Sequence, residues 1–539
     1  MLIKKNPVLP GFHPDPSILA VGDDYYLATS TFQWFGGVEL YHSKDLINWE
    51  QLPCPLTRKS QLDMDANPNS GGVWAPCLSY SDGVFYLIYT NVKNFHGIFK
   101  DTHNYLVTTT DLYGEWSEPI YLNSSGFDPS LFHDDDGKKY LVNMRWDHRV
   151  EHHDFAGILM QEYDPVAKKL VGEIKTIYKG TEIGGTEAPH LYKKNGYYYL
   201  MVAEGGTMYN HGVRLARSKN IWGEYESDPQ PLLTTRNNPE KYMQRTGHAS
   251  YIEASNGQGY VAYLCGRPLR EKVLVDWSLG CSMLGRETCI APVKWEDGWL
   301  RLENGTEIPP EEYYSTLPEV KYPEKPERDY FNNDTLPLHY KTLRSPFCEL
   351  GSLTEREGFL RIYGREAITS ANRQSVVARR LDAFSAEASC KLEFSPKTFQ
   401  QMAGLTVFYD TYNFFYLYMS RDEESGENCL RIVVRDSLKF YNPIKDYRAL
   451  IGQNETVWLR ASINRLELEF SYSLDGENYT SIGGKLDSSN LCDEAYGLIG
   501  HEGHTGTFIG MAVEDLTGEK AYADFQYFEY KKGSVTSPN

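Results

Sequence analysis

Short runs that alternate apolar and polar residues, separated by turn residues, fill the first 300 or so positions of the chain. Sustained 3.6-residue periodicity is scarce there. Period-2 runs between turn signals predict strands, here over 25–30, 84–90, 138–144 and 197–203. Three of these runs follow the Asx-Gly pairs Asp82-Gly83, Asp136-Gly137 and Asn195-Gly196, which are strong hairpin signals. The pattern therefore predicts an all-β domain made of consecutive hairpins.

A short phrase that begins an apolar run recurs in this region at intervals of roughly 60 residues, as expected for the blades of a propeller. Its five copies read HPDPSI, VWAPCL, GFDPSL, TEAPHL and TGHASYI. The inner strand of each blade lines the propeller axis, so equivalent residues of successive copies meet in space. We therefore predict a five-bladed β-propeller over residues 1–320.

The repeat ends before a stretch rich in Pro and charge, EVKYPEKPERDYF, which has the composition of an interdomain linker. Alternating runs such as CKLEFSP, CLRIVVRDS and LRASINRLELEFSYSLDG follow it. These runs predict that residues 321–539 form a β-sandwich.

Composition narrows the class of ligand and the cellular compartment. The formal net charge is -19, with a pI near 5.3, which disfavours nucleic acid and anionic membranes as partners and favours a neutral ligand. Nine cysteines are scattered without a C-x-x-C pair and are expected to be reduced thiols, mostly buried. The first residues lack an apolar run, and no stretch reaches the roughly 18 apolar residues of a membrane span. We therefore expect a cytoplasmic protein.

Three acidic residues stand at or beside the repeated position. Asp15 and Asp128 both occur in the context Asp-Pro-Ser, and Glu187 stands one residue before the equivalent position of the fourth copy. Glycosidic bond hydrolysis requires one carboxylic acid and one carboxylate, and carboxylates that converge on an axis raise one another's pKa. The alternative is that Asp-Pro-Ser caps a turn, although Glu187, after a glycine-rich approach, has no evident cap to make.

The motifs NPVLPGFHPDPSI, GGVWAPCL, GFDPSLF, GGTEAPHLYK and LGRET stand in this order along the chain. With them, the chain resembles glycoside hydrolase family 43 β-xylosidases of the two-domain group over essentially its whole length, which implies a concanavalin-like sandwich. The resemblance implies that Asp15 is the general base and Glu187 the general acid, and that Asp128 orients the acid and raises its pKa. It implies an inverting, exo-acting enzyme that releases D-xylose from xylobiose and short β-1,4-xylo-oligosaccharides.

The same resemblance nominates substrate contacts. Phe32 and Trp74 would contact the sugar, and Arg286 in LGRET would donate hydrogen bonds to hydroxyls, with a surface ion pair as the alternative. Phe508 in GHTGTFIG would lie on a sandwich loop that closes the pocket at one end, with an ordinary core residue as the alternative.

The resemblance also suggests a metal ion and an assembly. His248 replaces the carboxylate of the fifth copy, which we place at the same offset as Glu187, and the family suggests a calcium ion near it. Calcium prefers several oxygen ligands, so one imidazole is weak support, and no cofactor is expected to be required for the chemistry. A homotetramer or homodimer is also implied.

Two other functions remain open. An α-L-arabinofuranosidase could use the same pocket as its main or second activity, because the two pentoses have similar shapes; an endo-acting arabinanase would need an open groove. A non-catalytic carbohydrate-binding propeller is the other alternative, since aromatic and polar groups suffice for binding. Three converging acids disfavour the binding function, because they would repel one another without serving a neutral sugar.

Overall fold

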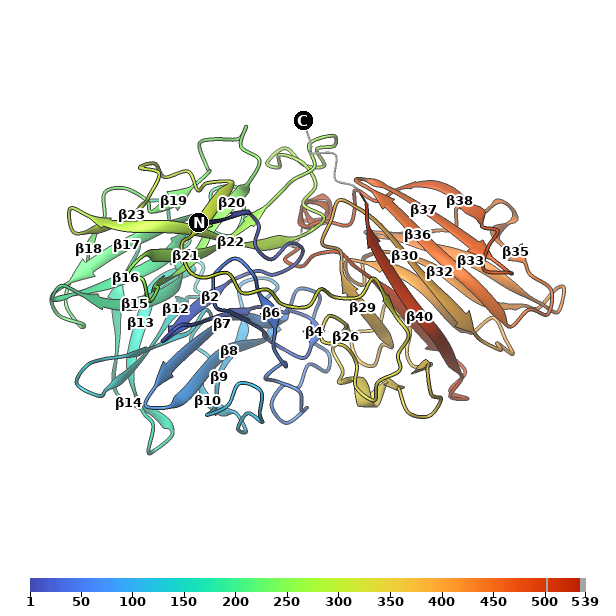
Figure 1. The fold of residues 1–539 in the computed structure, drawn as a ribbon, viewed down its shortest axis with the longest axis horizontal. Helices are drawn as coiled ribbons and strands as arrows, with labels where there is room; N and C mark the ends of the chain where they lie inside the picture. The colour runs from blue at the N-terminus through green and yellow to red at the C-terminus, as the bar shows by residue number, and fades with distance from the viewer. Residues whose placement is uncertain (501–502, 534–539) are drawn as a thin grey trace. The chain divides into compact units, whose positions relative to one another are not determined.

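The chain forms two compact units, seen in the computed structural model of the protein (Figure 1). The structure describes residues 1–500 and 503–533. The first unit consists of Met1–Asp63, Gly71–Arg267 and Arg286–Tyr322, and the second of Met64–Ser70, Pro268–Gly285 and Pro323–Asn539. The main division follows Tyr322. The second unit therefore takes two segments from earlier in the chain, which a single boundary near residue 320 does not include.

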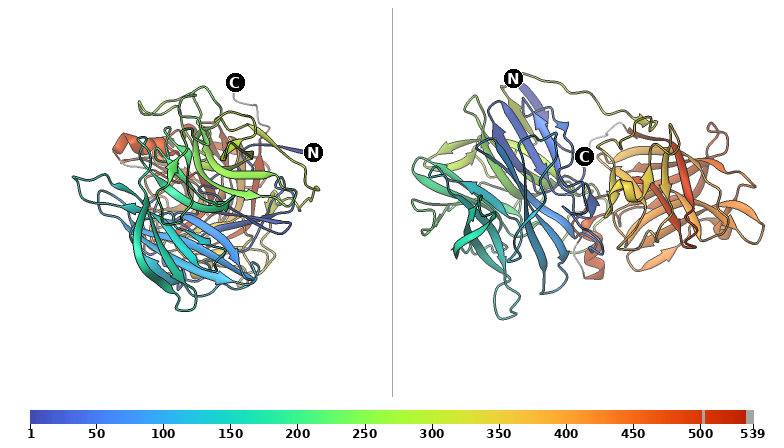
Figure 2. Two further views of the ribbon diagram at one scale, coloured as in Figure 1. Left: turned by 90° about the vertical axis from the view of Figure 1, so that its left-hand side faces the viewer. Right: turned by 90° about the horizontal axis from the view of Figure 1, so that it is seen from below.

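The first unit is a five-bladed β-propeller, and the five antiparallel sheets follow one another in chain order (Figures 1 and 2). Blade one consists of β2 (Ser17–Val21), β3 (Asp24–Thr29), β5 (Glu39–Ser43) and β6 (Glu50–Gln51). Blade two consists of β7 (Gly72–Ser81), β8 (Val84–Asn94), β9 (Asp101–Thr109) and β10 (Ile120–Asn123). Blade three consists of β11 (Ser130–His133), β12 (Lys139–Trp146), β13 (Phe155–Asp164) and β14 (Lys169–Tyr178). Blade four consists of β15 (Glu187–Lys194), β16 (Tyr197–Glu204), β17 (Gly212–Ser218) and β18 (Glu226–Ser227), with β19 (Leu233–Thr234) beside β17. Blade five consists of β20 (Gln244–Glu253), β21 (Gly259–Gly266), β22 (Arg286–Glu296) and β23 (Trp299–Leu302).

Three short strands complete this unit. The N-terminal strand β1 (Leu2–Lys5) pairs with β24 (Glu312–Ser315), and β4 (Trp34–Phe35) lies between β3 and β5 in the chain. The predicted propeller is confirmed, because every copy of the repeated phrase lies on or directly before the first strand of a blade.

The hairpins use the turn chemistry that the sequence predicted. Asp82-Gly83 joins β7 to β8 with φ of 55° and 80°, and Asn195-Gly196 joins β15 to β16 with φ of 51° and 78°. Two successive positive φ values are the signature of a type I′ turn, whose twist matches that of the paired strands. These two Asx-Gly pairs therefore set where β7 and β15 reverse, whereas at Asp136-Gly137 only Gly137 has a positive φ, of 84°.

Side-chain hydrogen bonds join the first strands of neighbouring blades just beyond the repeated position. Ser250 of blade five donates to the Pro16 carbonyl oxygen at 3.0 Å and accepts from the Ile18 amide at 2.8 Å. Ser130 of blade three donates to the Pro189 carbonyl oxygen at 2.5 Å. Pro16 and Pro189 directly follow the repeated position, so these serines anchor the backbone beside the predicted catalytic residues.

The second unit is a β-sandwich with a single large apolar core between two antiparallel sheets. One sheet has the order β27-β28-β40-β30-β36-β37-β38 with β25 beside β40: β25 (Arg328–Asp329), β27 (Gly351–Ser352), β28 (Leu360–Tyr363), β30 (Ser385–Glu393), β36 (Thr456–Asn464), β37 (Glu467–Ser473), β38 (Thr480–Asp487) and β40 (Tyr522–Lys532). The other has the order β34-β33-β32-β31-β39-β29-β26 with β35 beside β33: β26 (Lys341–Leu343), β29 (Val376–Arg380), β31 (Gln401–Phe408), β32 (Asn413–Asp422), β33 (Glu427–Asp436), β34 (Lys439–Tyr441), β35 (Ala449–Leu450) and β39 (Phe508–Asp515).

The helices of the described chain are short 3-10 turns: η1 (Phe347–Glu349), η2 (Lys445–Tyr447) and η3 (Asp493–Ile499). None of the helices in the described part of the chain has the length and apolarity needed to span a bilayer. The cysteines are thiols and most are buried, as the sequence predicted.

Candidate active site

The predicted catalytic carboxylates are carried by unusual backbone at the start of three blades. Asp15 and Asp128 stand two residues before the first strands of blades one and three and have left-handed φ angles of 56° and 54°. In blade four the left-handed residue is Ala188, with φ of 52°, and Glu187 stands one residue earlier, as the sequence comparison placed it. A non-glycine residue costs energy in this region, so such residues tend to mark functional positions.

His248 occupies the repeated position itself. Its φ is 48°, which makes it the counterpart of Asp15 and Asp128, so the prediction that it shares the offset of Glu187 is wrong. The register of blade five shifts between Gly247 and Ser250. The copy TGHASYI lacks the proline that aligns the other four copies, and the sequence alone therefore misplaced it by one residue.

Asp15 lies in a cationic and hydrogen-bonding environment. Its Oδ1 is 2.7 Å from Arg286 Nη1 and 3.6 Å from His248 Nδ1, and its Oδ2 accepts a hydrogen bond from Ser30 Oγ at 2.5 Å. Burial raises the pKa of Asp15, but Arg286, His248, Ser30 and His211 together outweigh it and hold the pKa below its ordinary value. Asp15 is therefore ionised at neutral pH.

Two buried imidazoles border Asp15. Burial lowers the pKa of His248 to about 4, against the opposing charge of Asp15, and lowers the pKa of His211 to about 3. Both rings are consequently neutral at neutral pH. The full positive charge that holds Asp15 ionised comes from Arg286.

Asp128 lies in the opposite electrostatic situation. Its Oδ2 accepts a hydrogen bond from the Ala188 amide at 3.2 Å, which ties it to the residue after Glu187. Burial raises the pKa of Asp128 well above its ordinary value, and the negative charges of Glu187 and Asp15 raise it further. Interacting carboxyl groups titrate as a pair, so Asp128 and Glu187 together retain a proton at a pH where Asp15 has lost its own.

Aromatic rings extend from Arg286 along the inner ends of blades one to three. The Arg286 guanidinium carbon is 5.0 Å from the centroid of Phe32, whose ring is 6.0 Å from that of Trp74. Phe127 packs edge-on against Trp74 at 5.1 Å, and Trp146 follows at 6.3 Å from Phe127. The structure thus brings the predicted Phe32 and Trp74 together and adds Phe127 and Trp146, which the sequence reasoning missed although Phe127 directly precedes Asp128.

Other residues of the site had no sequence signal. Thr207 Oγ1 lies 3.2 Å from Arg286 Nη1, and His211 packs so closely on Gly247 that a Cβ there would lie 1.6 Å from its Cδ2 atom. Both come from the irregular loop between β16 and β17, where no repeat or periodicity marks a position. Ser30, directly after β3, was missed for the same reason.

Phe508 belongs to the second unit, and there it is the first residue of β39 rather than part of a loop. Its side chain is fully buried, and the Arg380 guanidinium carbon is 5.3 Å from the ring centroid. Gly503–Thr507, the described residues just before it, have no regular structure. The pocket-closing role of Phe508 stays a prediction.

The residues around His248 fit calcium poorly. Calcium takes six to eight oxygen ligands, whereas His248 presents a ring nitrogen to Asp15, whose two oxygens are already bonded to Arg286 and Ser30. Within residues 1–500 and 503–533, no group of three or more His, Cys, Asp or Glu side chains is placed to hold a metal ion. The calcium assignment therefore gains no support.

Comparison with known proteins agrees with this geometry. Residues 4–300 match the glycosyl hydrolases family 43, and residues 328–531 match the beta xylosidase C-terminal concanavalin A-like domain. The beta-xylosidase of Bacillus subtilis (strain 168) is 47% identical over 531 residues, 98% of this chain and 99% of that protein. Xylosidase/arabinosidase 43B of Humicola insolens is 46% identical over 537 residues, 98% of this chain and 97% of that protein. The crystal structure of xylan beta-1,4-xylosidase from Bacillus halodurans C-125 has 51% identity and a TM-score of 0.94, and covers 98% of this chain and 100% of that one. The chain therefore belongs to glycoside hydrolase family 43 and carries the concanavalin A-like domain found at the C-terminus of beta-xylosidases.

Proposed function

We propose that this glycoside hydrolase is an inverting, exo-acting β-xylosidase that releases D-xylose from the non-reducing end of xylobiose and short β-1,4-xylo-oligosaccharides. The observation that carries the proposal is the contrast between two aspartates at equivalent repeat positions. Arg286 keeps Asp15 ionised, whereas burial and the charge of Glu187 keep a proton on the Asp128–Glu187 pair. Glycoside hydrolysis needs one carboxylate and one carboxylic acid.

In this proposal Asp15 is the general base. It removes a proton from the water that attacks the anomeric carbon, and the new C–O bond forms as the glycosidic bond breaks. Its neighbours Arg286 and Ser30 stabilise the carboxylate and fix its orientation. Because the attack comes from the face opposite the leaving group, the sugar is released with inverted configuration.

Glu187 is the general acid and gives its proton to the departing glycosidic oxygen. Asp128 is a positioning residue, because its Oδ2 accepts a hydrogen bond from the adjoining Ala188 amide and its carboxyl group repels that of Glu187, so that the two buried groups do not both ionise. The pair therefore keeps the acid protonated near neutral pH.

Arg286, Phe32 and Trp74 provide the proposed sugar contacts. The guanidinium is a rigid fork of donors, which suits vicinal hydroxyls, and the rings of Phe32 and Trp74 offer flat apolar surface to the hydrophobic face of a pentose. These are neutral-sugar contacts, in keeping with the acidic net charge of the chain.

An α-L-arabinofuranosidase activity, as the main or a second activity, is the alternative. The dual name of the Humicola insolens relative favours it. Comparing kcat/KM for aryl β-D-xyloside and aryl α-L-arabinofuranoside decides which pentose the pocket prefers. The closing role of Phe508, assembly as a tetramer or dimer and cytoplasmic location stay predictions beside this function.

The first experiment follows xylobiose hydrolysis by proton NMR and records the anomer of xylose at early times. The proposal expects α-xylose, with turnover lost in Asp15→Asn and in Glu187→Gln. Initial β-xylose would contradict inversion and require a nucleophile. If the enzyme releases no xylose but releases arabinose from arabinosides, its main activity is that of an α-L-arabinofuranosidase.

A second experiment separates the acid from the base. Glu187→Gln is expected to lower kcat/KM for xylobiose by about 10²- to 10⁴-fold, but to spare an aryl xyloside whose leaving group needs little protonation. Asp15→Asn is expected to impair both substrates equally, because water must be activated in either case. Equal loss on both substrates for Glu187→Gln would refute its assignment as the acid.

A further inference from the structure

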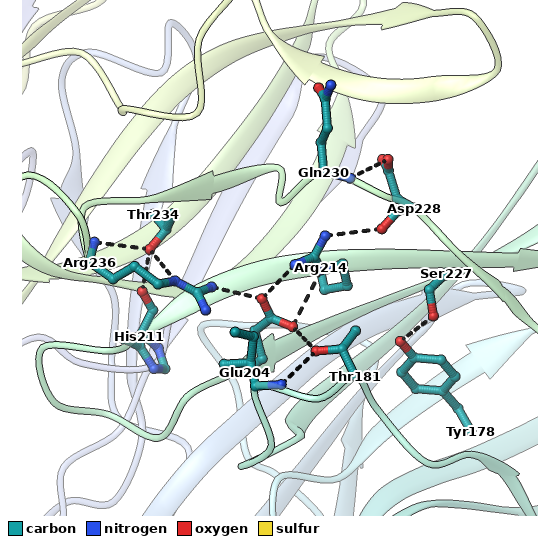
Figure 3. Close-up of polar contacts among 11 residues, drawn as sticks. Tyr178, Thr181, Glu204, His211, Arg214, Ser227, Asp228, Gln230, Thr234 and Arg236 are labelled. Carbon is teal, nitrogen blue, oxygen red and sulfur yellow. Dashed lines mark hydrogen bonds and ion pairs between the residues drawn. The ribbon is translucent and has the colours of Figure 1, made fainter.

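A buried carboxylate that the proposed chemistry does not use lies at the end of β16. Glu204 has 1% of its surface exposed and sits between two arginines (Figure 3). Its Oε1 is 3.0 Å from Arg214 Nη2 and 2.7 Å from Arg236 Nη2, and its Oε2 accepts from Arg214 Nε at 3.3 Å and from Thr181 Oγ1 at 2.7 Å. The contacts on the carboxylate therefore come from three separate parts of the chain: β17, the segment after β19 and the segment before β15.

Stability alone does not account for such a cluster. A buried ion pair is usually no more stabilising than apolar residues of the same shape, because removal of the charges from water is costly. Burial raises the pKa of Glu204, but the hydrogen bonds from Arg214, Thr181 and Arg236 outweigh it and keep the group ionised. An ionised, fully bonded carboxylate holds its partners in one geometry.

One of these partners lies on the approach to Glu187. Thr181 belongs to the glycine-rich segment between β14 and β15, and β15 begins at Glu187. The next residue after Glu204 holds the same segment, because the Gly205 amide donates to the Gly184 carbonyl oxygen at 2.8 Å. The Glu204 side chain and the Gly205 amide thus hold the segment before Glu187 by two hydrogen bonds.

The other side of the cluster reaches the loop that borders Asp15. Arg236 Nε donates to Thr234 Oγ1 at 3.2 Å, and Thr234 Oγ1 donates to the His211 carbonyl oxygen at 2.7 Å (Figure 3). His211 ends the loop that also carries Thr207, and Thr207 contacts Arg286. Glu204 and Arg236 together thereby connect both sides of the site.

We propose that Glu204 is a positioning residue that, through Thr181, holds the segment leading to Glu187 in the geometry for proton donation to the leaving group. The inference rests on the proposed acid role of Glu187 and extends it to the groups that orient the acid. Glu204 itself contacts no reacting atom in this proposal.

The test removes a single hydroxyl. Thr181→Val has nearly the same shape but cannot donate to Glu204, and Thr181→Ser keeps the hydroxyl. The measurement is the ratio of kcat/KM for xylobiose to kcat/KM for an aryl xyloside with a good leaving group. We expect Thr181→Val to lower this ratio about tenfold, since small misplacements of a catalytic group are costly, and Thr181→Ser to restore it. Glu204→Gln is expected to change the ratio in the same direction.

The controls separate positioning from loss of fold. Thr406→Val removes a hydroxyl that likewise donates one hydrogen bond, to the Phe415 carbonyl oxygen at 3.0 Å in the second unit, and should leave the ratio unchanged. If Glu187→Gln lowers the ratio but Thr181→Val leaves it unchanged, whether or not both kcat/KM values fall, the inference is overturned. If Glu187→Gln leaves the ratio unchanged, the acid assignment itself fails and the inference fails with it.

Discussion

The protonation state of Asp15 can be tested without touching a catalytic residue. Ser30 is fully buried and donates one hydrogen bond to Asp15 Oδ2 at 2.5 Å. A hydrogen bond to a charged group contributes about 1.5 to 3 kcal/mol, and about 1.4 kcal/mol corresponds to one pKa unit. Ser30→Ala removes this bond from the ionised form, so it should raise the pKa of Asp15 and move the acid limb of kcat/KM upward by roughly one pH unit.

The assay is the pH profile of kcat/KM for xylobiose, read beside Ser30→Thr, which retains a hydroxyl. The base must be ionised, so the activity of Ser30→Ala should fall at higher pH than that of the parent enzyme but recover on the plateau. The bonds from Arg286 remain, so the shift should stay well short of abolishing activity at neutral pH. An unshifted limb with a uniformly lower plateau would refute the assignment of Asp15 as the base whose charge Ser30 stabilises.

Three further results are expected. Ser250→Ala leaves the Ile18 amide and the Pro16 carbonyl without their side-chain partner and should lower the free energy of unfolding by about 1 to 3 kcal/mol, measured by denaturant titration; no loss would contradict the role of Ser250 in joining blades five and one. Burial raises the pKa of Asp410 to about 7, so between about pH 4 and pH 7 the folded sandwich keeps a proton that the unfolded chain releases. The free energy of unfolding should therefore fall as pH rises through this range. Asp410→Asn should flatten that dependence, and an unchanged slope would contradict the prediction. A chain cut after Tyr322 loses Glu494, which accepts from Ser282 Oγ at 2.7 Å, and Thr411, which accepts from Asn69 Nδ2 at 2.7 Å. The shortened chain should therefore turn over no xylobiose. An active isolated propeller would show that the sandwich is dispensable.

The blades of the propeller could be predicted from sequence because their signals are local. Alternation of apolar and polar residues and the Asx-Gly turns act within a single hairpin, and the repeated phrase shows where each hairpin begins. The same repeat predicts that Asp15 and Asp128 share one backbone position, and their nearly equal φ angles agree with that prediction. It failed at His248, because the fifth copy lacks the proline that sets the alignment.

The sequence by itself therefore determined the all-β class, the family and the acidic candidates Asp15, Asp128 and Glu187. Only the tertiary structure decided which carboxyl group is ionised, because the charge that controls Asp15 comes from Arg286, 271 residues along the chain, and the proton retained by the Asp128–Glu187 pair depends on burial and on the repulsion between the two groups. It also decided that Met64–Ser70 and Pro268–Gly285 belong with the sandwich, and that Glu204 accepts a hydrogen bond from Thr181 in the segment before Glu187. Electrostatic fields and burial act through space, whereas repeats and periodicity record only order along the chain.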